Sequence, residues 1–509
     1  MTTPLTDHDD PFDTAVAERI ATYRRTREQV ERSVLPLATS IDGVTFEFQS
    51  SLHRLALRRG GYVILQSEGA NRLGQVTDIG AEVSISDGQS GEPTVTAPIA
   101  MRLARGSGIV LDTDGSPFHD ALVRPAEPSE VGDWFDRIRP DRAGLDVGEF
   151  VLAPGVPAVL DSGGLDRHTF LCGQSGSGKT YALGLLLERV LAETSLQLVI
   201  LDPNSDYVGL SRVREGADAA LAARYAGVPE QVSVWSNKPG ADHLLRFKFA
   251  DLDAAAQAAV LGLDPIQDRE EYAVLVDLLR AQRDGQDVGV ETLRTSDDPA
   301  IRRLGMRAEN LGVLGWSIWN PNEPSLVEEL RHPTSRCIVV DLGSLDAPGE
   351  QRTVSQAVLS TLWEERLTKV PRLIVIDEAH NICPAEPPDE VSRLSMDRAI
   401  QIAAEGRKYG LYLLTSTQRP HKVHENIVSQ CDNLLLMRMN SQGDLAELST
   451  LFSFVPRGLM TGSTSFRLGQ VLVGGKLLRQ AAYVQMGSRV SQEGGADIPT
   501  TWAAARPAT

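Results

Sequence analysis

Residues 173–180 read Gly-Gln-Ser-Gly-Ser-Gly-Lys-Thr, and this stretch decides the fold. A short apolar run, 169–172, comes before it, and apolar residues recur at helical spacing over 181–192 after it. The order of an apolar strand, a glycine-rich turn ending in Lys-Thr and a helix is the signature of a phosphate-binding Walker A loop. The sequence therefore predicts a strand, a phosphate loop and a helix in succession.

Each residue type in this loop suits the binding of a nucleoside triphosphate. The expected nucleotide-binding residues are Gly173, Gln174, Ser175, Gly176, Ser177, Gly178, Lys179, Thr180 and, further along the chain, Asp377. The glycines let backbone N–H groups converge on phosphate oxygens, which a Cβ would obstruct. Lys179 is expected to reach the β- and γ-phosphates, and the Thr180 hydroxyl to ligate Mg²⁺. We therefore expect ATP and Mg²⁺ as cofactors, bound at a helix N-terminus.

A second apolar strand, Leu373–Ile376, ends in two acids. Asp377 is expected to hold Mg²⁺ through water, and Glu378 to polarise the attacking water as a general base. The run Asp-Glu-Ala-His therefore predicts hydrolysis as well as binding. We interpret His380 as a residue that either begins a helix or lies behind the two acids.

Three further positions are candidates for the mechanism. Asp202, directly after an apolar strand, either orients water and metal or caps the turn before Pro203. The run 405–410 offers one or two cations, Arg407 and Lys408, that either reach the γ-phosphate of a neighbouring subunit as arginine fingers or complement a helix end. Gln418, just past another strand, either senses the γ-phosphate or belongs to a polar turn.

Length and composition bound the remaining possibilities. A chain of 509 residues with 42% hydrophobic and 23% charged residues is expected to form two or three globular domains. It contains no apolar run of about 18 residues and no basic or apolar leader, which predicts a cytoplasmic protein that does not enter a membrane. The four cysteines have no spacing typical of zinc sites or disulfide frameworks. The net charge of −18 argues against an exterior that binds nucleic acid all over, but leaves room for a narrow basic channel.

Patterning along the chain predicts four segments. An N-terminal extension over 1–40 contains an amphipathic helix at 11–35, and short β-rich runs over 41–160 predict a small barrel. Strands and helices alternate over 161–490, which predicts a mostly parallel α/β sheet with an inserted helical subdomain at about 250–332. Residues 491–509 are expected to form a flexible tail.

In order, the motifs are Gly173–Thr180, Asp202–Tyr207, Leu373–His380, Gly406–Gly410 and Thr417–Pro420. This series resembles the HerA-like ATPases of the HerA/FtsK group over roughly residues 40 to 490. The run 74–79 resembles part of the small barrel that precedes their motor, and the run 466–475 resembles their closing strands. The resemblance implies a RecA-like P-loop ATPase domain of the ASCE class behind an N-terminal β-barrel.

The resemblance also implies a function and a set of residue roles. Family members are hexameric rings that thread double-stranded DNA as helicases or translocases and work with a nuclease or other effector. It implies that Lys179, Glu378, Arg407 and Gln418 are catalytic, with Arg407 the arginine finger and Gln418 the sensor. It also implies that Thr180 and Asp377 hold the metal.

These implications lead to two hypotheses of different classes. The first is an ATP-hydrolysing, ring-forming DNA motor with a nuclease or NAD-consuming effector, in anti-phage defence or DNA end processing. The alternative is an ATP-gated hexameric scaffold that regulates a partner enzyme and moves DNA little. The sequence departs from many relatives after Asp202, where Pro203-Asn204-Ser205 stands in place of His and Gly. The roles of Asp202 and Asp206, the partner, the preferred DNA end and the direction of travel stay open.

Overall fold

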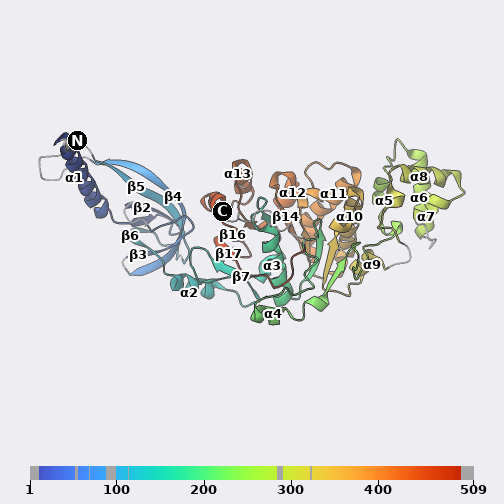
Figure 1. The fold of residues 1–509 in the computed structure, drawn as a ribbon, viewed down its shortest axis with the longest axis horizontal. Helices are drawn as coiled ribbons and strands as arrows, with labels where there is room; N and C mark the ends of the chain where they lie inside the picture. The colour runs from blue at the N-terminus through green and yellow to red at the C-terminus, as the bar shows by residue number, and fades with distance from the viewer. Residues whose placement is uncertain are drawn as a thin grey trace, which may run out of the picture. The chain divides into compact units, whose positions relative to one another are not determined.

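The computed structural model describes residues 11–51, 56–67, 69–86, 99–112, 114–283, 290–320 and 324–494. The chain forms two compact units, which are described separately (Figure 1). The first unit comprises 1–138, 151–156 and 456–462, and the second comprises 139–150, 157–455 and 463–509. Residues 1–10 of the predicted N-terminal extension lie outside the described residues, as do residues 495–509 of the predicted tail.

The first unit is built on a closed six-stranded barrel. Its strands are β1 (Leu37–Ser40), β2 (Thr45–Ser51), β3 (Tyr62–Ser67), β4 (Ala70–Ser86), β5 (Ile99–Val110) and β6 (Phe118–Pro125). Their order around the barrel is β1-β2-β5-β4-β3-β6, with all neighbours antiparallel. Residues 70–86, which include the run 74–79, form one continuous strand, β4, with a bulge between Val76 and Asp78. The bulge bends the strand, so no turn is needed at Gly80.

Glycine lets aromatic rings fill this barrel. The buried side chains of Phe46 and Phe48 project inward from β2. A Cβ at Gly108 on β5 would lie 2.2 Å from Phe46 Cζ, and one at Gly106 would lie 2.5 Å from Phe48 Cζ. Both glycines therefore make room for the rings at the centre of a small barrel.

Three helices complete the described part of the first unit: α1 (Pro11–Ser33), α2 (Pro128–Ile138) and α14 (Arg457–Gly462). The predicted amphipathic helix is therefore present, and it ends before Pro36. One face of α2 is buried, and it is formed by Val131, Trp134 and Phe135. Within the described residues, no helix is both long and apolar enough to traverse a lipid bilayer.

The second unit is a mixed sheet of eleven strands. The strands are β7 (Gly144–Phe150), β8 (Pro157–Asp161), β9 (His168–Cys172), β10 (Gln197–Asp202), β11 (Val232–Trp235), β12 (Cys337–Asp341), β13 (Arg372–Ile376), β14 (Leu411–Thr417), β15 (Cys431–Leu436), β16 (Gln470–Gly475) and β17 (Ala482–Met486). Their order is β11-β12-β10-β13-β14-β9-β15-β16-β17-β7-β8. The first seven run parallel, and the other four extend the sheet as antiparallel strands. Strands β7 and β8, which the sequence analysis grouped with the barrel, belong to this sheet.

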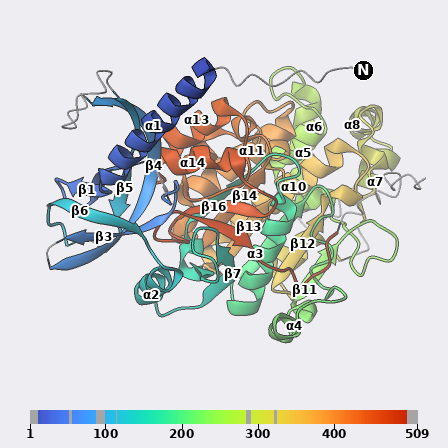
Figure 2. The ribbon, with the colours of Figure 1, turned by 60° about the vertical axis from the view of Figure 1, so that its left-hand side comes forward.

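Helices cover both faces of this sheet (Figures 1 and 2). They are α3 (Lys179–Glu193), α4 (Ala219–Tyr225), α10 (Pro348–Glu364), α11 (Glu390–Glu405), α12 (Glu425–Val428) and α13 (Gln442–Leu451). Right-handed crossovers put α3 on one face and α10 and α11 on the other, because the chain reverses its direction across the sheet after β11. The prediction of a doubly covered P-loop ATPase fold is confirmed.

The predicted helical insertion is present between β11 and β12. It comprises α5 (Ala254–Val260), α6 (Arg269–Arg283), α7 (Val290–Thr295), α8 (Pro299–Asn310) and α9 (Leu326–Arg331). Asp253 and Asp298 accept hydrogen bonds from backbone N–H groups at the starts of α5 and α8. These side-chain caps explain why the helices begin where they do.

A buried ion pair ties the end of the described chain to α3. Glu188 on α3 and Arg489 are both fully buried, with Arg489 Nε 3.1 Å from Glu188 Oε1. The same carboxylate accepts hydrogen bonds from the backbone N–H groups of Val490 and Ser491 at 2.7 and 2.8 Å. Residues 489–491 are therefore held against the helix that follows the phosphate loop, and are not part of a free tail.

This pair predicts a large loss of stability in one variant. Arg489→Ala leaves the Glu188 charge buried without its counter-ion and should lower the free energy of unfolding by about 3 kcal/mol. Arg479→Ala, which removes an exposed cation from the same unit, should change it by less than about 0.5 kcal/mol. Urea unfolding followed by circular dichroism measures both. Equal midpoints for the two variants would show that the pair does not stabilise the unit.

Candidate nucleotide site

The phosphate loop joins β9 to α3, as the sequence predicted. Gly176 and Gly178 have φ angles of 71° and 91°, in the left-handed region that favours glycine. Helix α3 begins after Gly178 without a side-chain cap, so the N–H groups of its first turn have no side-chain partner. The Ser177 hydroxyl is also buried without a hydrogen-bond partner among the described residues. These unmatched donors and the helix dipole suit a bound anion.

Lys179 lies at the centre of the site, although it is buried. Its Nζ is 2.8 Å from Asp377 Oδ1 and 3.0 Å from Glu378 Oε1, and it donates a hydrogen bond to Ser416 Oγ at 3.0 Å. Burial by itself would lower the pKa of Lys179, but the two carboxylates outweigh it and hold the pKa above its usual value. The ammonium therefore acts as an internal counter-ion for both acids.

Glu378 is held in an unusual backbone conformation. Its φ of 43° is in the left-handed region, which a non-glycine residue rarely adopts. Gln418 Nε2 donates to Glu378 Oε1 at 3.0 Å, so the predicted sensor and base are in contact. The other carboxylate oxygen, Oε2, lies 3.3 Å from His380 Nδ1 but accepts no hydrogen bond from the described residues. This buried oxygen therefore keeps an unused capacity to accept a hydrogen bond.

His380 lies behind this carboxylate. Its Nδ1 is 3.1 Å from Thr417 Oγ1 at the end of β14. Burial lowers the pKa of His380, Glu378 opposes this, and Arg419 adds to the lowering. The ring is therefore neutral near pH 7, with no charge of its own to hold Glu378.

The loop after β10 places two acids differently. Asp202 is buried and turned into its own loop, where it accepts hydrogen bonds from the backbone N–H groups of Asp206 and Tyr207 at 2.9 and 2.8 Å. Burial raises the pKa of Asp202 to about 7 in spite of these bonds. Asp206 instead faces the phosphate loop, with Thr180 Oγ1 donating to its Oδ2 at 3.5 Å. Between the two alternatives for Asp202, the turn cap agrees with the observed bonds.

A cavity of about 680 Å³ lies over the loop. Its lining residues are Gln174, Ser175, Gly176, Gly178, Lys179, Thr180, Tyr181, Asp206, Gln418, Leu468, Gly469, Gln485, Met486, Gly487 and Glu493. Most of the predicted loop residues therefore line this cavity. Gly173 and Ser177 are not among its lining residues. A Cβ on Gly173 would lie 2.7 Å from Met437 Cβ and 2.9 Å from Ser177 Oγ, so the loop is closely packed there.

The residues present fit Mg²⁺ only together with a nucleotide. No cluster of three or more His, Cys, Asp or Glu side chains suited to a metal occurs in the described part of the chain. Asp377 is buried, with Oδ1 on Lys179 and Oδ2 accepting from the Tyr207 hydroxyl at 3.2 Å. Thr180 and Asp377 can therefore supply a minority of the ligands, which agrees with the preference of Mg²⁺ for phosphate oxygens and water.

Arg407 is not part of this site within one chain. It lies in the turn before Leu411, where β14 begins, and its Nη1 is 2.8 Å from Asp432 Oδ2. The phosphate loop follows Cys172, where the parallel strand β9 ends. Arg407 thus lies at the amino ends of the parallel strands, whereas the phosphate loop lies at their carboxyl ends.

Sequence reasoning missed several residues of the site, among them Ser416, Tyr207 and Glu493. Ser416 and Tyr207 hold Lys179 and Asp377, and Glu493 comes to the cavity from the far end of the described chain. Ser416 gave a weak signal, as a hydroxyl at the end of an apolar strand. Nothing in the local sequence indicates the other two, because their partners are distant along the chain.

Comparison with solved structures finds VirB4 of Thermoanaerobacter pseudethanolicus, at 16% identity and a TM-score of 0.45, covering 69% of this chain and 98% of that one. The plasmid coupling protein TrwB in complex with a non-hydrolysable GTP analogue has 14% identity and a TM-score of 0.45, and the match covers 72% and 94% of the two chains.

The family model and the curated relatives that match this chain carry the same family name. Residues 145–362 match the family described as "Helicase HerA, central domain". The DNA double-strand break repair helicase HerA of Pyrococcus furiosus is 22% identical over 409 residues, 67% of this chain and 69% of that protein. The HerA helicase of Sulfolobus acidocaldarius is 20% identical over 493 residues, 90% and 94% of the two chains.

The site predicts that binding and turnover of ATP separate in two variants. Glu378→Gln should still bind ATP but hydrolyse it at least about a hundredfold more slowly, because the amide cannot accept a proton from water. Lys179→Ala should bind no ATP and provides the comparison. Fluorescent-nucleotide titration and phosphate release measure the two steps. Near-normal hydrolysis by Glu378→Gln would exclude this carboxylate as the base.

Proposed function

The chain belongs to the HerA-like P-loop ATPases, and from this premise we propose that it is a ring-forming motor that moves along double-stranded DNA at the expense of ATP. The observation that carries the proposal is the cluster of Lys179, Asp377, Glu378 and Gln418 beside an uncapped helix N-terminus. This arrangement joins a phosphate-binding end to a carboxylate that can activate water.

The chemistry proposed for the site is an exchange of counter-ions. Bound ATP would supply phosphate oxygens as partners for Lys179, and its phosphoanhydride bond to the γ-phosphate is the bond that is broken. Lys179 then leaves Asp377 and Glu378 for the phosphates, since phosphate carries more charge than one carboxylate. Asp377 would then help to hold Mg²⁺ together with Thr180, and Glu378 would be free to accept a proton from water. The base thus becomes available only when nucleotide is present.

Gln418 is the proposed sensor of the γ-phosphate. Its amide now donates to Glu378 Oε1, and its side chain also borders the cavity over the phosphate loop. A γ-phosphate would compete with Glu378 for this amide. Loss of the phosphate would return Gln418 to Glu378 and move the chain that follows, Arg419 to Lys422.

Arg407 is the proposed arginine finger, acting between subunits. It is exposed, and it forms an ion pair with Asp432, whose Oδ2 also lies 3.3 Å from Arg167 Nε. Asp432 thus retains a cation when Arg407 turns away. Because Arg407 lies at the edge of the sheet away from its own phosphate loop, the nucleotide it can reach belongs to a neighbour in a ring.

The proposed assembly is a homohexamer in the cytoplasm that works with a nuclease or NAD-consuming effector, in anti-phage defence or DNA end processing. What supports this finer proposal is family membership, since the relatives named above are double-strand break repair helicases. The exposed apolar residues Val16, Ile20 and Tyr23 on α1 add a surface on which a partner could dock.

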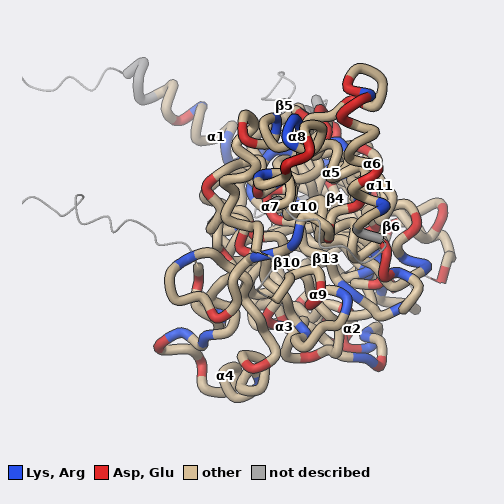
Figure 3. Tube along the Cα trace, turned by 90° about the vertical axis from the view of Figure 1, so that its right-hand side faces the viewer, with Lys and Arg blue, Asp and Glu red and all other residues tan. Residues whose placement is uncertain are grey.

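One observation favours a second candidate function. The chain carries 50 Lys and Arg against 68 Asp and Glu, and blue and red segments are interspersed along the tube in Figure 3. A strongly acidic protein repels DNA over most of its surface. The alternative is therefore an ATP-held hexameric scaffold that gates a partner enzyme and moves DNA little.

Stimulation of ATP hydrolysis by DNA separates the two candidates. For a motor, linear duplex DNA should raise the ATPase rate, and the DNA concentration needed should increase steeply with salt, since each phosphate contact contributes roughly −0.9 to the log–log slope. The measurement uses protein whose ring size is known from light scattering. A hexamer whose ATPase ignores DNA at every salt concentration would establish the scaffold instead.

Mixed rings test the action of Arg407 between subunits. Arg407→Ala and Glu378→Gln should each be inactive, because one lacks the finger and the other lacks the base. Mixing them should restore part of the ATPase rate, since some interfaces then combine an intact finger with an intact base. Arg479→Ala, which removes an exposed cation elsewhere in the same unit, should keep its activity. If rings shown to be mixed remain inactive at all ratios, Arg407 does not act across the interface.

A further inference from the structure

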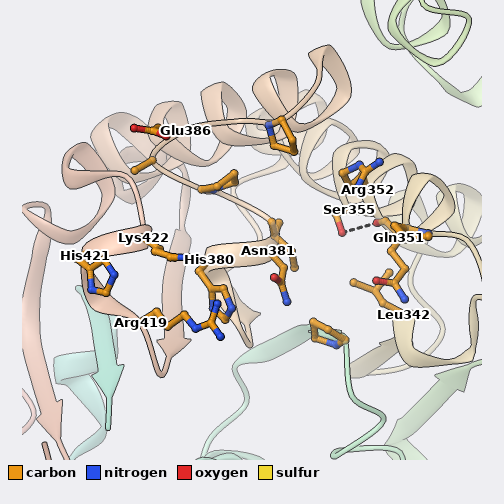
Figure 4. A pocket seen from close by; sticks show the side chains of 16 residues that line it. Leu342, Gln351, Arg352, Ser355, His380, Asn381, Glu386, Arg419, His421 and Lys422 are labelled. Atoms are coloured by element: carbon orange, nitrogen blue, oxygen red, sulfur yellow. Dashed lines mark hydrogen bonds between the residues drawn. The ribbon is translucent and has the colours of Figure 1, made fainter. Parts of the chain in front are cut away.

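A second pocket, also of about 680 Å³, opens at the carboxyl edge of the sheet. It is formed by the chain after β13, the chain after β14 and the first turns of α10 (Figure 4). It shares no lining residue with the cavity over the phosphate loop. It can therefore be filled while a nucleotide occupies that cavity.

The second pocket is basic, although the chain is acidic. Three cations, Arg352, Arg419 and Lys422, line it against one acid, Glu386. Arg352 is paired with Asp389, its Nε lying 2.8 Å from Asp389 Oδ2. Among the described residues, the charged ends of Arg419 and Lys422 have no hydrogen bond or ion pair, and both residues are exposed. Two adjacent cations without counter-ions are the electrostatic feature that a phosphate group requires.

The side chains on one side of this pocket converge. In Figure 4, Arg419, Lys422 and His380 point toward one another, whereas Glu386 points away from them. His380 contributes to the wall of the pocket and also lies 3.3 Å from Glu378 Oε2, the buried oxygen that accepts no hydrogen bond. One ring thus separates the pocket from the carboxylate proposed to activate water.

We propose that the second pocket binds a backbone phosphate of duplex DNA through Arg419 and Lys422, and that His380 makes the position of Glu378 depend on that phosphate. This inference rests on the proposed motor function. A phosphate beside the two cations gives the His380 ring a new acceptor. A ring that turns toward the phosphate leaves Thr417 and Glu378, and it opens Oε2 to the attacking water. His380 is a positioning residue in this scheme, since it touches the base and not the nucleotide.

The proposed motor function favours a nucleic-acid phosphate over an acidic protein surface as the occupant of the second pocket. Arg419 and Lys422 are three residues apart on the turn that follows Gln418, the proposed sensor. The two cations that would hold the DNA therefore lie close along the chain to Gln418, which contacts Glu378. Binding that must respond to each hydrolysis event needs such a short connection.

Removal of the two cations tests the binding step. The variant R419A/K422A should bind a fluorescent linear duplex at least about tenfold more weakly, and the slope of log affinity against log salt should become shallower by about one. The matched control is K369A/R479A, which removes two exposed positive charges from elsewhere in the same unit and should bind like the wild type. Light scattering gives the ring size of every variant.

Variants of His380 test the coupling step. His380→Ala should bind the duplex and ATP as the wild type does, but the ratio of DNA-stimulated to unstimulated kcat should fall toward one. His380→Asn, whose amide can occupy the place of Nδ1, should restore part of that ratio. A residue with a merely structural role would lower kcat with and without DNA alike, and Asn would not restore the ratio.

The outcomes distinguish this inference from the proposed function. If the wild type is stimulated by DNA and R419A/K422A is stimulated equally, with unchanged affinity, the second pocket is not the phosphate site and the motor stands. If R419A/K422A loses its ring and binds DNA only in proportion to that loss, the pocket is an interface between copies. Unchanged coupling in His380→Ala overturns the role of that residue. A wild type that neither binds DNA nor responds to it contradicts the motor, and this inference with it.

Discussion

The second unit depends on one buried ammonium. Lys179 Nζ is shared by Asp377, Glu378 and Ser416, so a single charge joins the phosphate loop to the ends of two neighbouring strands. Two buried carboxylates without a cation would repel each other and lose their hydration. Lys179 stabilises both, and in the proposed mechanism phosphate would replace them as its partner.

The order of strands makes this arrangement possible. Strands β9, β14 and β13 are adjacent and parallel, so their carboxyl ends meet at one edge. Residues separated by about two hundred positions come within hydrogen-bond distance there, as Lys179 and Asp377 do. Gln418, which borders the cavity over the phosphate loop, and His380, which borders the second pocket, both contact Glu378, so the proposed nucleotide and DNA phosphate would act on the same carboxylate. Coupling between them needs only small movements of side chains at that edge.

Much of the site follows from local chemistry, and some of it does not. The positive φ angles of Gly176 and Gly178 and the acids after β13 were predictable, because a phosphate loop and a strand end each have a short-range signature. The continuous strand β4 was not, since a bulge and a turn leave similar sequence patterns at Gly80. Nor was the burial of Arg489 against Glu188, because that pairing spans 301 positions along the chain.

The sequence by itself determined the α/β class of the second unit, the β-barrel of the first, the phosphate loop and the pair Asp377 and Glu378. These features depend on residue type and on spacing within a few positions. Only the tertiary structure decided that Tyr207 holds Asp377, that Asp202 faces its own loop and that Arg407 lies at the far edge of the sheet. Each of these depends on which strands become neighbours, and that order follows from packing the whole sheet and its helices, not from any single segment.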